Sequence, residues 1–334
     1  MRGKHNTMKS RTADGFPRSI IGTGLAALLA SLACQTSAAG PLRDQIAQHR
    51  AAESANAIDQ DEGNARSPAP LPASVQIVRD VPYGSDARQR FDVYLPEHPK
   101  DAPVIFMVHG GAWRYGYKSA HTVVDNKVAR WVAKGFVFIS TDYRLLPEAD
   151  PIEQARDVAR ALSSAQDQAA SWGADRSKFI LMGHSAGAHL VALLATDIAL
   201  TPNTEITPWL GIVELDSAAI DVVSIMQGRH MGLYDAAFGR DPRYWKAASP
   251  LSAMTSATRP IFAVCSTRRV ESCRHAHRAA GKAKTLGVQF TVLEKDFSHR
   301  EINQRLGEDA RYTAEVESFM ARLDPVVASK LTGG

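Results

Sequence analysis

The sequence predicts an α/β fold: a mostly parallel, twisted sheet of about eight strands, with helices on both faces and a small cap. Three observations carry this prediction. Short apolar runs alternate with helix-like stretches from residue 74 onward, which is the pattern of a parallel sheet covered on both faces. Several runs, such as PVIFMV at 103–108, are almost continuously apolar, as strands buried on both sides are. The segment 218–258 is too long for a simple connection, so we expect it to form the cap.

The expected elements follow in chain order. VQIVRDVPYG and QRFDVYL, at 75–84 and 89–95, show period-two alternation in places and form an opening antiparallel pair. Buried strands are expected at 103–111, 135–145, 178–185, 211–217, 260–266 and 288–294, and helices at 119–134, 152–172, 186–197, 273–286 and 309–323. The chain has 334 residues, of which 45% are hydrophobic. This is enough for one domain, which we place at 74–328.

Residues 1–39 have the features of a signal peptide. A basic start that ends at Arg18 precedes an apolar core near 20–33, and Ser37 and Ala39 fit the −3 and −1 positions of a cleavage site. The leader holds five basic side chains and one acidic one, which accounts for the net charge of +4. The rest of the chain is balanced, which argues against nucleic-acid binding. Because the apolar core is short, we expect no stable membrane span after cleavage.

The leader therefore predicts export, to the periplasm or out of the cell. Lipidation at Cys34 or tethering by an uncleaved leader are the alternatives. Residues 40–73, rich in Ala, Gln, Asp and Pro, would form an N-terminal extension and linker. Cleavage leaves two cysteines, Cys265 and Cys273. In an oxidising compartment, this pair suggests a disulfide.

The clearest chemical signal is the G-x-S-x-G pattern GHSAG at 183–187. It follows the apolar run KFILM and opens the helix-like run AGAHLVALL, the strand–turn–helix setting that a nucleophilic serine requires. The glycines remove side chains that would clash in so tight a turn. Ser185 is therefore the expected nucleophile. The N–H of Ala186, at the start of a helix, is expected to face developing negative charge.

A second signal is HGGAW at 109–113, directly after the strand PVIFMV. Glycine lets the backbone approach a substrate carbonyl closely. The N–H groups of Gly110 and Gly111 are therefore expected to form an oxyanion hole with that of Ala186. Trp113 and His184 are expected to help line the substrate pocket.

Together these motifs resemble those of α/β-hydrolase carboxylesterases, in particular the group that includes feruloyl-esterase-like and kynurenine-formamidase-like enzymes. The resemblance covers roughly 75–323. It rests on HGGAW, on TDYRLLPEA, on WGADRSKFILMGHSAGAHL and on a late histidine. It implies the α/β-hydrolase fold, serine-hydrolase activity, and no metal or other cofactor. The late histidine is His299, in KDFSHREIN after the last strand, where these enzymes place the general base.

The carboxylate that should orient His299 departs from this pattern. Members of the group usually end the seventh strand with a G-x-x-D-like segment, and laying PIFAVCSTR over it puts Arg268 at the aspartate position. An arginine cannot accept the histidine N–H. We expect Glu271, inside the loop CSTRRVESC, to be the acid. Asp216, at the end of GIVELD, is the alternative, and Asp296 is a third candidate.

The sequence thus predicts an exported carboxylesterase-type serine hydrolase. It would act on a small-molecule or polymeric ester through a Ser-His-acid triad and an acyl-enzyme intermediate. The same triad also serves amides, arylformamides, polyesters and polyamides. A non-catalytic binding protein of the same fold is a further alternative. The sequence leaves the natural substrate and the oligomeric state open.

Overall fold

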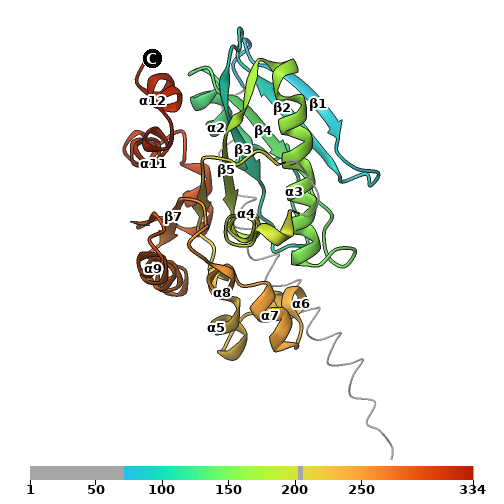
Figure 1. Ribbon diagram of the computed structural model, residues 1–334, viewed down its shortest axis with the longest axis vertical. Coiled ribbons are helices and arrows are strands. Elements are labelled where there is room, and N and C mark those ends of the chain that lie inside the picture. The colour runs from blue at the N-terminus through green and yellow to red at the C-terminus, as the bar shows by residue number, and fades with distance from the viewer. Residues whose placement is uncertain (1–70, 202–205, 334) are drawn as a thin grey trace, which may run out of the picture. The chain divides into compact units, whose positions relative to one another are not determined.

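The computed structural model describes residues 71–201 and 206–333. The predicted leader, Cys34 and most of the predicted linker lie outside these residues. Within them, eight strands form one sheet in the order β1-β2-β4-β3-β5-β6-β7-β8 (Figure 1). The strands are β1 (Gln76–Pro82), β2 (Arg90–Leu95), β3 (Ala102–Val108), β4 (Val137–Thr141), β5 (Ala174–His184), β6 (Gly211–Leu215), β7 (Ile261–Ser266) and β8 (Phe290–Lys295).

Strand direction and burial agree with the predicted fold class. β2 pairs antiparallel with both β1 and β4, and the remaining neighbours pair in parallel. Every residue of β3, β4, β6 and β7 is buried. Their nearly continuous apolar sequences therefore reflect strands covered on both faces. The edge strand β1 is mostly exposed.

Helices cover both faces of this sheet. An apolar cluster under α3 and α4 fills one face, and a second cluster under α2, α11 and α12 fills the other. Figure 1 shows these two groups on opposite sides of the strands. The helices are α2 (His121–Trp131), α3 (Pro151–Gln168), α4 (Ala186–Thr196), α5 (Val222–Gln227), α6 (Gly232–Phe238), α7 (Pro242–Ala247), α8 (Pro250–Ala253), α9 (Val270–Thr285), α10 (His299–Gln304), α11 (Ala310–Leu323) and α12 (Pro325–Thr332). Short 3₁₀ turns are η1 (Ala169–Trp172), η2 (Ile198–Leu200) and η3 (Ala219–Asp221).

The predicted cap consists of the four short helices α5 to α8, which gather together in Figure 1. Leu233, Tyr234 and Phe238 of α6 are buried in the same apolar cluster as Trp113. The cap is therefore packed onto the end of the sheet where the HGGAW loop lies.

The segment between Cys265 and Cys273 differs from its predicted form. Helix α9 begins at Val270, three residues earlier than expected, so Glu271 lies in a first helical turn and not on an extended loop. The predicted pairing of the two cysteines is confirmed: they form a disulfide, with Cα atoms 5.1 Å apart. None of the helices in the described part of the chain is long and apolar enough to cross a membrane.

Candidate active site

Ser185 lies in the sharp turn between β5 and α4. Its backbone has φ 55° and ψ −115°, a conformation that side-chain-bearing residues rarely adopt and that costs energy. Two hydrogen bonds hold the turn. The Ser185 N–H donates to the carbonyl of Leu215 (2.9 Å), and the Ser185 carbonyl accepts from the N–H of His189 (3.1 Å). The strain and these bonds together fix the serine at the carboxyl end of the sheet.

The two glycines of GHSAG are required by close backbone contacts. A Cβ atom at Gly183 would lie 2.4 Å from the carbonyl oxygen of Gly187. A Cβ atom at Gly187 would lie 2.2 Å from the carbonyl oxygen of Val108, at the end of β3. Neither position has room for a side chain. The turn and the start of the HGGAW loop are therefore in direct contact.

The HGGAW loop lies against this turn. A Cβ atom at Gly110 would meet the Cβ of Ser185 at 3.1 Å, and Gly111 has φ +119°. Tyr143 fixes the loop, because its hydroxyl donates to the His109 carbonyl (2.9 Å) and its ring stacks on the His109 ring. The backbone of the predicted oxyanion-hole residues therefore lies next to the serine.

Trp113 lies in the wall of the pocket above Ser185. Its indole N–H donates to Nδ1 of His189 (3.2 Å), and its ring packs edge-on against Phe238 at 5.0 Å. The Nε2–H of His189 donates to the carbonyl of Ala248 (2.8 Å), and burial lowers the pKa of His189 to about 4. A neutral His189 on α4 thus joins this helix to the cap and orients the tryptophan.

His184, predicted to line the pocket, instead lies behind the site. Its side chain is buried, and its Nε2 donates to the carbonyl of His299 (3.0 Å). Burial, followed by the nearby His299, lowers the pKa of His184 well below its ordinary value. Because side chains alternate along a strand, the residue before Ser185 packs beneath the His299 ring, with the ring centroids 4.5 Å apart.

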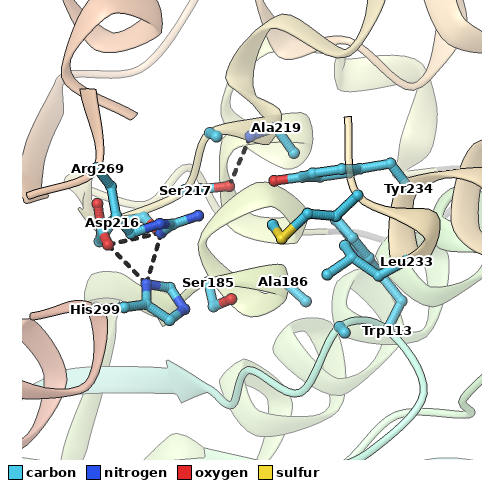
Figure 2. Close-up of a pocket in the computed structure, with 13 residues that line it drawn as sticks. Trp113, Ser185, Ala186, Asp216, Ser217, Ala219, Leu233, Tyr234, Arg269 and His299 are labelled. Atoms are coloured by element: carbon cyan, nitrogen blue, oxygen red, sulfur yellow. Dashed lines mark hydrogen bonds and ion pairs between the residues drawn. The ribbon is translucent and has the colours of Figure 1, made fainter. Parts of the chain in front are cut away.

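His299 is the first residue of α10. The preceding Ser298 and Glu301 form a capping box that fixes the helix start. Nδ1 of His299 is 2.6 Å from Oδ2 of Asp216, which directly follows β6. Asp216 is fully buried and has φ 55°. Figure 2 shows Ser185, His299 and Asp216 in one pocket, with the dashed contact between the last two.

The geometry favours Asp216, the alternative candidate, over Glu271 as the partner of His299. The Glu271 side chain is 61% exposed and pairs with Arg274 and His275 along α9. Glu271 lies in the first turn of α9. An acidic side chain is favourable there because it faces the positive end of the helix dipole. The third candidate, Asp296, is 81% exposed and pairs with Arg268 at 2.8 Å.

Asp216 is held ionised in spite of its burial. Burial by itself would raise the pKa of this carboxyl. The hydrogen bond with His299 and the positive charge of Arg269 outweigh burial, so the pKa of Asp216 lies well below its ordinary value. An ionised carboxylate only accepts hydrogen bonds. It therefore fixes the tautomer of His299 with the proton on Nδ1 and leaves Nε2 free of a proton.

Arg269 is the site residue that the sequence analysis did not identify. It contacts both of these groups, with Nη1 2.7 Å from Oδ2 of Asp216 and 2.7 Å from Nδ1 of His299. Since Nδ1 gives its proton to the carboxylate, the arginine N–H donates to Asp216 and brings a positive charge beside the imidazole. The signal in the sequence is the arginine pair in CSTRRVESC, but the pattern does not show which arginine reaches the site.

The pocket itself is small, about 20 Å³, which is room for one or two water molecules. It is lined by Ala112, Trp113, Ser185, Ala186, Asp216, Ser217, Ala218, Ala219, Met231, Leu233, Tyr234, Arg269 and His299. Apolar side chains of the cap form one wall, and the polar residues form the other (Figure 2). Across the described ranges 71–201 and 206–333, no three His, Cys, Asp or Glu side chains gather as a metal ion would require.

Comparison with known proteins gives three kinds of similarity. The BD-FAE family model matches residues 91–268. A probable isoprenylcysteine alpha-carbonyl methylesterase of Oryza sativa is 30% identical over 176 residues, which cover 49% of this chain and 41% of that protein. Kynurenine formamidase of Danio rerio is 35% identical over 124 residues, 36% of this chain and 40% of that protein. This chain thus spans less than half the length of both relatives.

Among solved structures, esterase B from Lactobacillus Rhamnosis superposes with a TM-score of 0.66 at 18% sequence identity. The superposition covers 86% of this chain and 96% of the esterase. At this identity the similarity concerns the fold. It agrees with the mostly parallel sheet and its covering helices.

Proposed function

The chain belongs to the BD-FAE family, and from this membership and the geometry of the pocket we propose that it is a carboxylesterase-type serine hydrolase. Ser185 is the nucleophile, His299 the general base and Asp216 the acid. One observation carries the proposal: His299, whose Nδ1 is 2.6 Å from Oδ2 of Asp216, shares a pocket with a serine on a strained strand–helix turn. This is the constellation that acyl transfer requires.

The reaction would proceed in two halves. His299 takes the Ser185 hydroxyl proton on Nε2 while Oγ bonds to the ester carbonyl carbon, and it then gives that proton to the departing alcohol. Water, activated by the same histidine, next attacks the acyl-enzyme and releases the acid. Asp216 stabilises the imidazolium that forms in each half. The N–H of Ala186, at the start of α4, and the backbone N–H groups of the HGGAW loop would stabilise the oxyanion.

The size of the pocket favours a short acyl group. The space beside Ser185 is small, about 20 Å³, which supports a short acyl group over a long chain. Arylformamide hydrolysis is the second candidate activity. The similarity to a kynurenine formamidase favours it, and the triad does not discriminate esters from amides.

Export is part of the proposal. Residues 1–39 carry the features of a signal peptide. The Cys265–Cys273 disulfide supports an oxidising compartment, because such bonds are rare where thiols are kept reduced.

A fluorophosphonate probe and a panel of p-nitrophenyl acetate, butyrate and octanoate with an N-formylanilide test the proposal. We expect the probe to label Ser185 and acetate to be cleaved faster than octanoate. Ser185→Ala should abolish labelling and lower kcat by about 10⁶-fold. Ser171→Ala, which changes an exposed serine outside the pocket, is the matched control. Labelling that survives Ser185→Ala contradicts Ser185 as the nucleophile. An unlabelled wild type contradicts the proposal and favours a non-catalytic binding protein.

A further inference from the structure

The segment from Cys265 to Cys273, here called the disulfide loop, supplies three hydrogen-bond donors to Asp216. The Ser266 N–H and the Ser272 hydroxyl donate to Oδ1, at 3.0 and 2.6 Å. Arg269 donates to Oδ2 at 2.7 Å. The carboxylate therefore comes from β6, and much of its hydrogen-bonding environment comes from this loop.

The two cysteines lie directly beside two of the donors. Cys265 precedes Ser266 at the end of β7, and Cys273 follows Ser272 in the first turn of α9. Their disulfide joins the strand end to the helix start. It therefore fixes the separation of the two groups that bind Oδ1, because each donor is one residue from a bridged Cα atom.

Arg269 holds the other side of the carboxylate. The same Nη1 donates to Oδ2 and to the Asp216 carbonyl oxygen, at 2.7 and 3.0 Å, so it fixes both the side chain and the strained backbone of this residue. Figure 2 shows the guanidinium group over Asp216 and His299. A buried carboxylate without such compensation would be costly.

We propose that the disulfide loop is a clamp for the triad carboxylate, in which Arg269 and Ser272 are positioning residues that aim Asp216 at His299. This inference rests on the proposed function. Arg269 has a second effect, because its positive charge beside Nδ1 opposes protonation of the imidazole. It thereby extends to lower pH the range in which His299 acts as a base.

Other ionisable side chains also face His299 or its neighbours. Asp216 lies on the β6 side, and the neutral His184 lies beneath the ring at the end of β5. The charge of Lys127 on α2 also lowers the pKa of His184, and burial lowers the pKa of Lys127 itself to about 7. Arg269 also acts on the pKa values of Asp216, Glu214 and Tyr234. Comparison of Arg269→Gln with Arg269→Lys, which keeps the charge, therefore isolates the effect of the positive charge on the pH profile.

The test compares Arg269→Gln, Arg269→Lys and Ser272→Ala on the full chain, with Arg274→Gln as the matched control. Arg274 is exposed and pairs with Glu271. Loss of a hydrogen bond to a buried charge should lower kcat by about 10-fold in Ser272→Ala and 10- to 100-fold in Arg269→Gln, with KM within about twofold. The acidic limb of the kcat/KM profile should move to higher pH in Arg269→Gln. In Arg269→Lys, which keeps the charge, it should stay in place and part of kcat should return.

The bridge is tested by Cys265→Ser with Cys273→Ser, and by reduction of the wild type with a phosphine. We expect kcat to fall about 10-fold with KM unchanged, in protein whose thermal unfolding remains cooperative. If the double variant does not fold, Ser272→Ala and Arg269→Gln decide the question.

Wild-type kcat and pH profiles in Ser272→Ala and Arg269→Gln, in protein that labels normally at Ser185, would overturn the clamp and leave the proposed function intact. An unlabelled, inactive wild type would instead overturn the proposed function, and the clamp with it.

Discussion

The turn that carries Ser185 is built from consecutive residues, whereas the environment of Asp216 is assembled from distant parts of the chain. The turn needs the five residues of GHSAG, and its glycines and helix start follow one another directly. Asp216 is held by residues 50 to 83 positions away, on β7, before and within α9, and at the start of α10. One half of the site is therefore a local motif, and the other half is a product of the tertiary fold.

This difference affects how each half responds to change. A local turn fails when one of its own residues no longer fits. A carboxylate that accepts hydrogen bonds from several partners should lose little activity when one partner is removed. It should lose much more when its own charge is removed.

The largest effect is expected at Asp216. Asp216→Asn keeps the shape of the side chain but removes the charge that stabilises the imidazolium and selects its tautomer, so kcat should fall by about 10⁴-fold. Glu271→Gln is the paired variant and should keep wild-type kcat, because Glu271 is exposed and bound to Arg274 on α9. Steady-state kinetics on a p-nitrophenyl ester measure both. The reverse result would restore Glu271 as the acid and remove the contrast between the two regions.

The next effect concerns the local half. Gly183→Ala would place a Cβ atom 2.4 Å from the carbonyl oxygen of Gly187, within the same turn. Because both partners are backbone, little can relax, and the variant should lose about 4 kcal/mol of unfolding free energy. Gly281→Ala, in the exposed part of α9 with nothing within 4 Å, should instead gain about 0.5–1 kcal/mol. Urea denaturation measures both changes. Equal stability of the two variants would show that the turn tolerates a side chain.

The same contrast explains what the sequence could predict. The prediction of the sheet, the cap, the Ser185 turn and the disulfide rested on hydrophobic periodicity, short motifs and the number of cysteines. Each of these features is present in the structure. The start of α9 was missed because Arg269 and Val270 carry no capping signal: Arg269, at the N-cap, makes no side-chain cap bond. Once α9 begins at Val270, Glu271 belongs to a solvent-facing turn. The preference for Glu271 therefore depended on a helix boundary, which is the least certain feature of a sequence-based prediction.

The position of Asp216 was available from the sequence, but its environment was not. GIVELD places an acid at a strand end, and the same pattern would suit a structural carboxylate. Only the fold brings Arg269 and Ser272 to it. The arginine that replaces the expected aspartate is Arg268, and it binds Asp296 at the surface. Its neighbour Arg269 is the one that reaches Asp216, and no short pattern distinguishes the two.

Glu214, on β6, is a second buried carboxyl group that can be compared with Asp216. It lies two residues before Asp216 and is also buried, but its carboxyl accepts from an uncharged donor, the backbone N–H of Ser217 (3.0 Å). Burial raises the pKa of Glu214 to about 8. Two buried carboxyl groups, one on β6 and one directly after it, thus have pKa values shifted in opposite directions, which favours a protonated Glu214 beside an ionised Asp216.

The smallest of the three effects follows from this buried acid. Between its ordinary pKa of 4.5 and the folded value of about 8, the unfolded chain releases the Glu214 proton while the folded chain keeps it. The folded state then binds more protons, so its stability falls as pH rises through this window. Glu214→Gln cannot lose a proton, and its advantage over the wild type should grow by about 3.5 kcal/mol between pH 5 and pH 8. Glu271→Gln, at an exposed position, should show no such trend in parallel urea denaturation at each pH. A difference in stability between Glu214→Gln and the wild type that stays constant with pH would mean that Glu214 is ionised in the folded protein, like Asp216.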